Sequence, residues 1–195
     1  MIKISAILLG AGESKRMGVD KLSLLWGRET VLEHCLETFL KSDVNEVIVV
    51  LGPRDKRLKG LSRSRKVKAV VNPIFRKGMS TSIRRGLQTI HSNSQGILIA
   101  LGDQPYLKTR TINALIRAFD QGKEEIVIPS FQGRMGHPVI FHHKYKKELL
   151  NLKGDVGGRS IVKRHPEEVR VVPVKSEGVV KDIDTWQDYV KELKK

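Results

Sequence analysis

The sequence predicts an α/β domain of three layers, in which helices cover both faces of a mostly parallel sheet. Short apolar runs typical of buried strands alternate with amphipathic helical patterns along most of the chain. The 195 residues suffice for one such domain with a sizeable core, and no repeat, low-complexity tract or long linker divides them. We therefore expect a single domain over residues 1–195.

Apolar runs predict the strands of this sheet. In chain order they are Ile4–Leu9, Glu46–Leu51, Val67–Val71, Ile97–Leu101, Ile126–Pro129, Val139–Phe141 and Val169–Val174. Ligands of such sheets bind at the carboxyl ends of the strands. The segments that follow Leu9 and Leu101 should therefore share one rim.

Helices are predicted from capping patterns and from apolar residues at helical spacing. Thr30 and Glu33 form a capping box that starts the first helix. Its apolar stripe consists of Val31, Leu32, Cys35, Leu36, Phe39 and Leu40, which makes Cys35 a core residue. Two further stripes consist of Ile83, Leu87 and Ile90, and of Ile112, Leu115, Ile116 and Phe119. Thr185 and Asp188 start a last helix, whose inward residues should be Trp186, Tyr189, Val190 and Leu193.

The composition favours a cytoplasmic protein with an anionic partner. The formal net charge is +15, and much of it lies in the basic run 54–66. That run has no interleaved aromatic residue for base stacking, so a solvated surface is favoured over nucleic-acid binding. Cys35 is the only cysteine, which excludes an intrachain disulfide. The N-terminus leads directly into a strand, and no apolar run approaches the roughly 20 residues of a membrane span.

A glycine-containing loop after the first strand is the strongest candidate for a phosphate-binding site. Gly10 and Gly12 allow the backbone to turn and to approach a ligand, and backbone N–H groups in such a loop can hold phosphate oxygens. Arg16 and Lys21 add positive charge behind the turn. An ordinary strand-to-helix turn with exposed basic residues is the simpler alternative for the two glycines alone.

Carboxylates at two places predict a metal site. Asp103 follows the apolar strand that ends at Leu101, and a carboxylate at a phosphate site normally holds Mg²⁺. A turn or helix cap is the alternative. Asp182 and Asp184 are two residues apart, so in an extended segment they point the same way.

The segment 72–87 contains a third candidate, at the start of a predicted helix. Free N–H groups there, together with the hydroxyls of Ser80 and Ser82, suit recognition of a base edge. Simple capping by Ser80, Thr81 or Ser82 explains the same residues without a ligand.

Several blocks in order along the chain resemble one family. Leu9-x-x-Gly-x-Ser-x-Arg-Met-Gly-x-x-Lys21 and Asp182-Ile-Asp-Thr185 are similar to motifs of the molybdopterin nucleotidyltransferases, which include cytidylyl and guanylyl enzymes. Asn72-Pro with Gly78-Met-Ser-Thr-Ser82 is similar to a motif of the cytidylyl branch. The resemblance implies a Rossmann-like nucleotidyltransferase fold. It implies a metal site formed by Asp103 and Asp184, with Asp182 in reserve. It implies nucleotide-binding residues at Leu9, Gly10, Ala11, Gly12, Ser14, Arg16, Lys21, Gly78 and Ser82, of which Arg16 and Lys21 act in catalysis.

Two later blocks resemble the part of these enzymes that meets the acceptor substrate. Gly133-Arg-Met-Gly-His-Pro-Val and Gly154-Asp-Val-Gly-Gly-Arg159 are similar to the cytidylyl branch, and they imply that His137 and Arg159 bind the pterin substrate. The implied reaction is Mg²⁺-dependent transfer of CMP from CTP to the terminal phosphate of molybdenum cofactor, with a molybdenum hydroxylase as a possible recipient of the product. Guanylyl transfer and a carrier without turnover are the alternatives.

Overall fold

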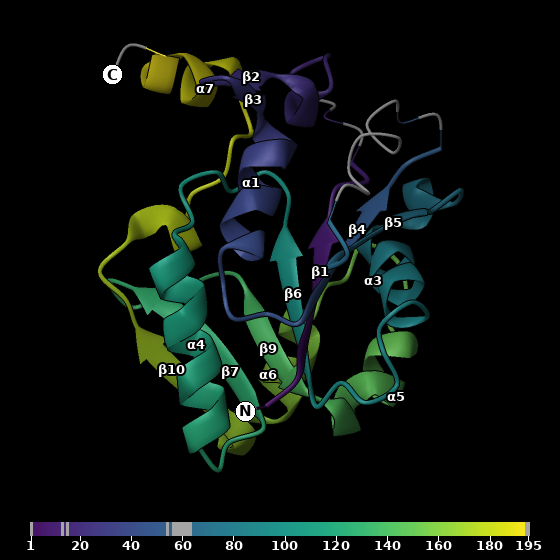
Figure 1. Cartoon of the computed structure of the whole chain (residues 1–195), viewed down its shortest axis with the longest axis vertical. Coiled ribbons are helices and arrows are strands. Elements are labelled where there is room, and N and C mark those ends of the chain that lie inside the picture. The colour runs from purple at the N-terminus through teal and green to yellow at the C-terminus, as the bar shows by residue number, and fades with distance from the viewer. Residues whose placement is uncertain (1, 13, 15, 54, 56–63, 194–195) are drawn as a thin grey trace.

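The computed structural model describes residues 2–12, 14, 16–53, 55 and 64–193, and these form a twisted sheet between helices (Figure 1). Within this part of the chain the main sheet has eight strands in the order β10-β7-β9-β6-β1-β4-β5, with β8 paired to β7. The pairs on either side of β1 are parallel, whereas β9 is antiparallel to both β6 and β7. The prediction of a mostly parallel sheet is confirmed.

The strands of this sheet are β1 (Ile4–Leu9), β4 (Glu46–Leu51), β5 (Val67–Val71), β6 (Gly96–Leu101), β7 (Ile126–Phe131), β8 (Arg134–Met135), β9 (Val139–His142) and β10 (Val169–Pro173). A separate hairpin consists of β2 (Leu25–Trp26) and β3 (Glu29–Thr30). In the described residues the α-helices are α1 (Val31–Leu40), α3 (Met79–Leu87), α4 (Thr109–Gln121), α5 (Lys146–Leu150), α6 (Arg159–Arg164) and α7 (Trp186–Leu193).

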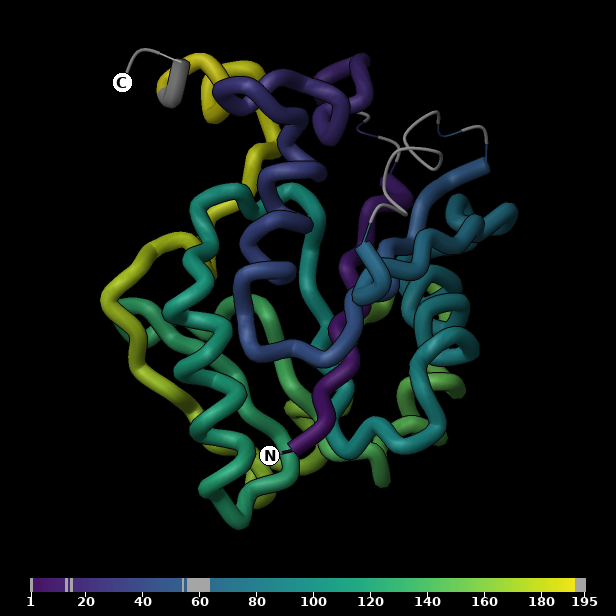
Figure 2. Tube along the Cα trace, in the orientation of Figure 1, coloured from purple at the N-terminus to yellow at the C-terminus, as the bar shows by residue number. Residues whose placement is uncertain are grey.

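Two hydrophobic clusters fill the spaces on the two faces of the sheet. Ala6 and Leu8 of β1 belong to the cluster that includes α1 and α4, whereas Ile7 belongs to the cluster that includes α3, α5 and α6. Successive side chains of a strand point to opposite faces, so one fully apolar strand supplies both cores. This is the three-layer arrangement expected from the sequence, and the chain trace can be followed through it in Figure 2.

The predicted helices form with the expected inner faces, apart from the last one. Cys35 is buried and forms no disulfide, and the Thr30–Glu33 capping box is present at the start of α1. In α7 only Tyr189 is buried among the described inward candidates, because Trp186 is 45% exposed and Val190 is 41% exposed. The prediction that Trp186 and Val190 point inward is therefore wrong. Trp186 instead lies over the β1–α1 loop and donates its indole N–H to the Met17 carbonyl at 3.1 Å.

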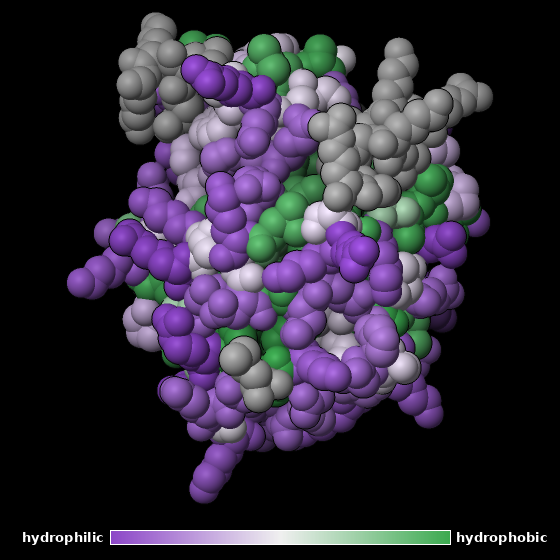
Figure 3. All heavy atoms as spheres, in the orientation of Figure 1, coloured by the Kyte–Doolittle hydropathy of each residue, from purple (hydrophilic) through white to green (hydrophobic). Residues whose placement is uncertain are grey.

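The face seen in Figure 3 is mainly hydrophilic, with smaller apolar areas between the polar side chains. No helix in the described part of the chain is long and apolar enough to cross a membrane. Most of the basic run 54–66 lies outside the described residues, so its predicted role as solvated surface stays a prediction.

Candidate active site

The carboxyl ends of β1 and β6 form the rim on which the candidate site is built. The two strands are parallel neighbours with Leu9 opposite Leu101, and Gly102 donates its N–H to the Leu9 carbonyl at 2.9 Å. A Cβ atom at Gly102 would lie 2.9 Å from the same carbonyl oxygen, so the close approach needs glycine. The glycine loop and Asp103 therefore share one rim, as the sequence predicts.

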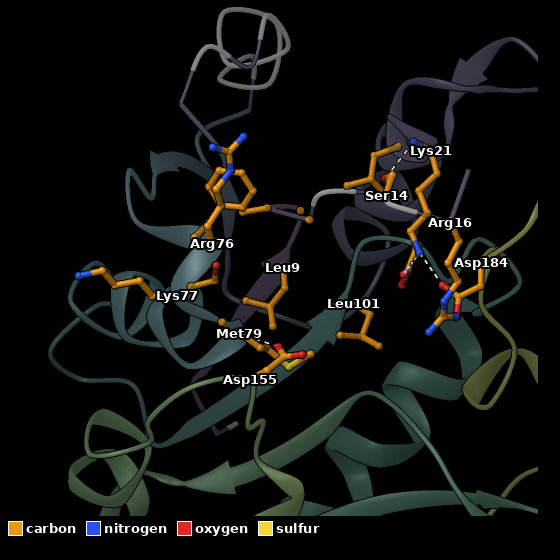
Figure 4. A pocket seen from close by; sticks show the side chains of 18 residues that line it. Leu9, Ser14, Arg16, Lys21, Arg76, Lys77, Met79, Leu101, Asp155 and Asp184 are labelled. Atoms are coloured by element: carbon orange, nitrogen blue, oxygen red, sulfur yellow. Dashed lines mark hydrogen bonds and ion pairs between the residues drawn. The ribbon is translucent and has the colours of Figure 1, made fainter. Parts of the chain in front are cut away.

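A pocket of about 630 Å³ opens at this rim (Figure 4). Its walls come from the β1–α1 loop, the end of β6, the start of α3, and the segments around Asp155 and Asp184. The lining residues are Leu9, Gly10, Ala11, Gly12, Ser14, Arg16, Lys21, Leu22, Phe75, Arg76, Lys77, Gly78, Met79, Ser82, Leu101, Asp103, Asp155 and Asp184. All the residues predicted to bind nucleotide are among them.

Lys21 connects the two carboxylates that were predicted as metal ligands. Its ammonium Nζ lies 2.6 Å from Asp103 Oδ2 and 2.8 Å from Asp184 Oδ1, and its side chain is only 14% exposed. Burial alone would lower the pKa of Lys21, but the charges and hydrogen bonds of Asp103 and Asp184 outweigh burial and raise it. The hydrogen bond from Lys21 lowers the pKa of Asp184. Lys21 is therefore charged at neutral pH and held in place.

Arg16 adds a second positive charge at the same end of the pocket. Its guanidinium donates to Asp184 Oδ2 at 2.5 Å, and the side chain is 72% exposed. An exposed ion pair is worth little to stability. Arg16 can thus leave Asp184 for an anionic ligand at small cost, whereas Lys21 is the more deeply placed cation.

Three carboxylates converge where a metal ion was predicted. One oxygen each of Asp103, Asp182 and Asp184 lies within 4.8 Å of the others. Asp103 Oδ1 is buried and has no hydrogen-bond partner among the described residues. Burial and the neighbouring carboxylates raise the pKa of Asp182. Hard divalent cations prefer oxygen ligands, so this donor set fits Mg²⁺ or Mn²⁺.

The two glycines of the β1–α1 loop have different roles. A Cβ atom at Gly10 would lie 2.8 Å from Leu51 Cδ2, so Gly10 lets the end of β1 pack against β4. No described heavy atom comes within 4 Å of a Cβ built at Gly12, so this glycine leaves open space at the pocket. The hydroxyl of Ser14 accepts a hydrogen bond from the backbone N–H of Lys21 at 3.2 Å. Ser14 thus orders the loop that carries Lys21.

The start of α3 differs from the sequence-based expectation of free N–H groups. Met79 donates its backbone N–H to Asp155 Oδ1 at 3.2 Å, and Ser80 donates to the Gly154 carbonyl at 3.2 Å. These two donors are therefore occupied by a loop from elsewhere in the chain, rather than free for a base or capped by nearby hydroxyls. Ser82 keeps its predicted place in the pocket, where its Oγ accepts a hydrogen bond from Asn72 Nδ2 at 2.9 Å.

Comparison with known proteins agrees with this geometry. The family model described as the MobA-like NTP transferase domain matches residues 6–169. The chain belongs to this family. Its members include nucleotidyltransferases that act in molybdenum cofactor synthesis, so the chain is a nucleotidyltransferase-family protein at the level of fold and class.

Several relatives align with nearly the whole length of this chain. The purine catabolism protein PucB of Bacillus subtilis is 30% identical, over 94% of this chain and 92% of its own. The nicotine blue oxidoreductase of Paenarthrobacter nicotinovorans is 29% identical, over 93% and 92%. The molybdenum cofactor cytidylyltransferase of Escherichia coli is 22% identical, over 97% and 95%.

Solved structures of Rv0371c from Mycobacterium tuberculosis resemble the MobA-like fold described above. One covers 100% of this chain and 98% of its own, with 28% identity and a TM-score of 0.83. Another, a complex with manganese, covers 98% of both chains, with 26% identity and a TM-score of 0.79.

His137 and Arg159, the two residues predicted to bind the acceptor, lie near each other but do not line the pocket described above. Burial, and next the charge of Arg159, lower the pKa of His137 to about 4, so the ring is neutral at pH 7. The His137 backbone N–H donates to the Val179 carbonyl at 2.7 Å, which holds the C-terminal segment against this part of the sheet. Their role in substrate binding stays a prediction.

Sequence reasoning missed several residues that line the pocket. These are Leu22, Phe75, Arg76, Lys77, Met79, Leu101 and Asp155. Of these, Asp155 lay in a block that the sequence analysis assigned to the acceptor side of the family. Its pairing with Met79 across 76 residues of sequence could not be found from local spacing.

Proposed function

We propose that the protein transfers CMP from CTP to the terminal phosphate of molybdenum cofactor and releases pyrophosphate, with Mg²⁺ as the metal. The observation that carries this proposal is the arrangement around Lys21. A buried ammonium and an exposed guanidinium face one pocket beside three carboxylates, at the end of the strand that leads into the glycine loop. Such a site suits a polyanion that binds together with a divalent cation.

In the proposed reaction an oxygen of the acceptor's terminal phosphate attacks the α-phosphorus of CTP. A new phosphorus–oxygen bond forms, and the bond to pyrophosphate breaks with its electron pair on the leaving group. Lys21 and Arg16 neutralise the charge of the triphosphate and of the departing pyrophosphate. The acceptor supplies the nucleophile, so the protein contributes positioning and electrostatic stabilisation and needs no nucleophilic side chain.

The metal would be held by Asp103 and Asp184, with Asp182 as the further carboxylate of the cluster. When bound, Mg²⁺ supplies additional positive charge for the phosphates. Asp103 Oδ1 is a suitable ligand because it is buried and lacks a hydrogen-bond partner among the described residues.

The choice of CTP rests on the cytidylyl-like segments Gly78–Ser82, Gly136–Pro138 and Gly154-Asp155. The start of α3 and Asp155 close one end of the pocket, and a pyrimidine needs less room there than a purine. Relatives of the chain include proteins named as cytidylyl and as guanylyl enzymes of molybdenum cofactor, so guanylyl transfer is the runner-up. A molybdenum hydroxylase is the proposed recipient of the product.

A thermal-shift panel followed by a transfer assay tests the proposal. The panel contains CTP, GTP, ATP and NADPH, each with and without Mg²⁺, and NADPH is present because one relative is named as an oxidoreductase. We expect the largest rise in Tm with CTP and Mg²⁺. Labelled CTP and GTP then compete for transfer to purified molybdenum cofactor, with an expected preference for CTP of about tenfold in kcat/KM. Stabilisation by NADPH alone, or binding of the cofactor without any transfer, would overturn the proposed activity.

A further inference from the structure

Arg16, Lys21 and Asp184 gather at one end of the pocket, and Met79 and Asp155 lie at the other (Figure 4). Arg76 and Lys77 also line the pocket on the side of Met79, but only the end with Lys21 combines positive charge with the carboxylate cluster. The side chains of Leu9 and Leu101 lie between the two ends in the same view. If the triphosphate binds with its metal at the end with Lys21 and Asp184, as the proposed function requires, the nucleobase lies at the end near Asp155.

Asp155 is held at this end by its own side chain and by the backbone of the preceding residue, Gly154. Its Oδ1 accepts the Met79 N–H at 3.2 Å, and the neighbouring Gly154 carbonyl accepts the Ser80 N–H at 3.2 Å. A Cβ atom at Gly78 would overlap the backbone of Gly154, so the two segments are in direct contact. The carboxylate therefore has a defined position on the wall of the pocket.

The hydrogen bond to α3 occupies only part of the capacity of this carboxylate. Within the described part of the chain, Asp155 has no other hydrogen-bond or ion-pair partner. An ionised carboxylate can only accept hydrogen bonds. The side chain of Lys77, a cation that also lines the pocket, extends away from Asp155 in Figure 4.

Ser82 offers the complementary chemistry in the same pocket, three residues after Met79 in the first turn of α3. Its Oγ already accepts a hydrogen bond from Asn72 Nδ2, so its own hydroxyl hydrogen is available to donate. The start of α3 and the Asp155 segment therefore bring one donor and one acceptor-only group to the pocket. Cytosine presents an amino group and ring acceptors, whereas uracil presents a carbonyl where cytosine has its amino group.

We infer that Asp155 is a specificity-determining residue, which accepts a hydrogen bond from the exocyclic amino group of the nucleobase and rejects bases with a carbonyl there. This inference rests on the proposed function, because it places the nucleobase by placing the triphosphate. A carbonyl oxygen facing Asp155 would leave both acceptors unpaired and would repel the carboxylate charge. Asp155 is exposed in the ligand-free protein, so this discrimination requires that the bound nucleotide cover the carboxylate and exclude water from it.

The test compares binding of CTP and UTP to the wild-type protein and to Asp155→Asn, by calorimetry with Mg²⁺ present. Asparagine keeps an oxygen that can accept the Met79 N–H, and it gains an amide donor for the uracil carbonyl. We expect wild type to prefer CTP over UTP by at least about tenfold in Kd, and Asp155→Asn to reduce that ratio to near one. Asp120→Asn, on the exposed surface of α4, is the matched control and should keep the wild-type ratio.

A CTP/UTP ratio that is unchanged in Asp155→Asn would overturn the inference while leaving the nucleotidyltransferase proposal intact. Asp155→Ala also removes the acceptor of the Met79 N–H. Circular dichroism and Tm of this variant show whether loss of that hydrogen bond unfolds the protein. If wild type binds GTP in place of CTP, the base assignment of the proposed function fails. The same variants, titrated with GTP and ITP, then test whether Asp155 accepts from the amino group of guanine; an unchanged GTP/ITP ratio would overturn the inference there too.

Discussion

Ile183 donates its backbone N–H to the carbonyl oxygen of Asp103 at 3.0 Å, and its side chain is fully buried. This bond fixes the C-terminal segment across the end of β6. The two carboxylates that flank Ile183 in sequence, Asp182 and Asp184, are thereby placed beside the carboxylate of Asp103. This backbone contact and the burial of Ile183 thus help to bring the three carboxylates together.

Asp103→Asn should keep the fold and lose Mg²⁺-dependent turnover. The amide retains the shape of the side chain but removes the negative charge that a divalent cation needs. We expect a fall in kcat/KM of at least about a hundredfold, with Tm close to wild type. Asp120→Asn on α4 serves as the control. Full turnover by folded Asp103→Asn protein would contradict the metal assignment.

Lys21→Met should strengthen metal binding in the absence of nucleotide while it weakens nucleotide binding. In the wild-type protein the Lys21 ammonium pairs with Asp103 and Asp184 and neutralises part of their charge. A metal ion bound by the same two carboxylates is therefore repelled by Lys21. Electron paramagnetic resonance of Mn²⁺ titrated into nucleotide-free protein measures this directly. We expect Kd for Mn²⁺ to fall about tenfold or more in the variant.

Lys68→Gln is the control for this experiment, because Lys68 pairs with Glu46 at the opposite ends of the strands. Its Mn²⁺ affinity should equal that of wild type. Weaker Mn²⁺ binding by Lys21→Met than by wild type would argue that Lys21 organises the carboxylates rather than competing for them.

Gly78→Ala should destabilise the protein more than Gly133→Ala. Both glycines have positive φ, +107° and +76°, but only at Gly78 would the new methyl group overlap another segment, the backbone of Gly154. Backbone strain costs about 1–3 kcal/mol, and Gly78 is placed at φ 107° and ψ 168°, a region that is essentially restricted to glycine. Steric overlap in a packed region adds about 1–3 kcal/mol. Urea denaturation of the two variants measures the difference. Equal losses would mean that the 154–155 loop moves aside freely.

Stability should fall as the pH is lowered from about 6.5 towards 4, in part because of His137. Its pKa in the folded protein is lowered to about 4 by burial and by the charge of Arg159, whereas an unfolded chain protonates histidine near 6.5. The unfolded state binds the additional proton in this window, so the free energy of unfolding decreases by up to about 3 kcal/mol. His137→Gln should show a shallower decrease in denaturation curves measured at pH 7, 5.5 and 4.5.

The main sheet and the rim of the site could be predicted because they depend on local sequence patterns. Apolar runs such as Ile4–Leu9 define their own strands, and parallel neighbours place their carboxyl ends at one edge. The short pairs β2–β3 and β8 were not predicted, since two-residue strands have no periodicity. The same applies to α5, whose five residues are too few to show a helical stripe.

The start of α3 shows what local patterns cannot supply. Met79 and Ser80 have hydroxyl-bearing neighbours that suggest a local cap, yet their N–H groups bind Asp155 and Gly154, whose sequence positions lie more than 70 residues away. Trp186 was assigned to the core by its spacing, but tertiary packing leaves it half exposed with its indole on the Met17 carbonyl. Both errors come from contacts between segments that no periodicity encodes.

The ion pair between Lys21 and Asp184 closes a loop of 163 residues. Contacts of such long sequence separation form slowly, because the entropy of closing the loop is lost before the contact contributes any stability. During refolding the glycine loop and Asp103 can order early on β1 and β6, but Asp184, the second acidic partner of Lys21, becomes available only when the last segment docks. Recovery of Mn²⁺ affinity after dilution from urea should therefore lag behind the recovery of helical circular dichroism and mark the final assembly step.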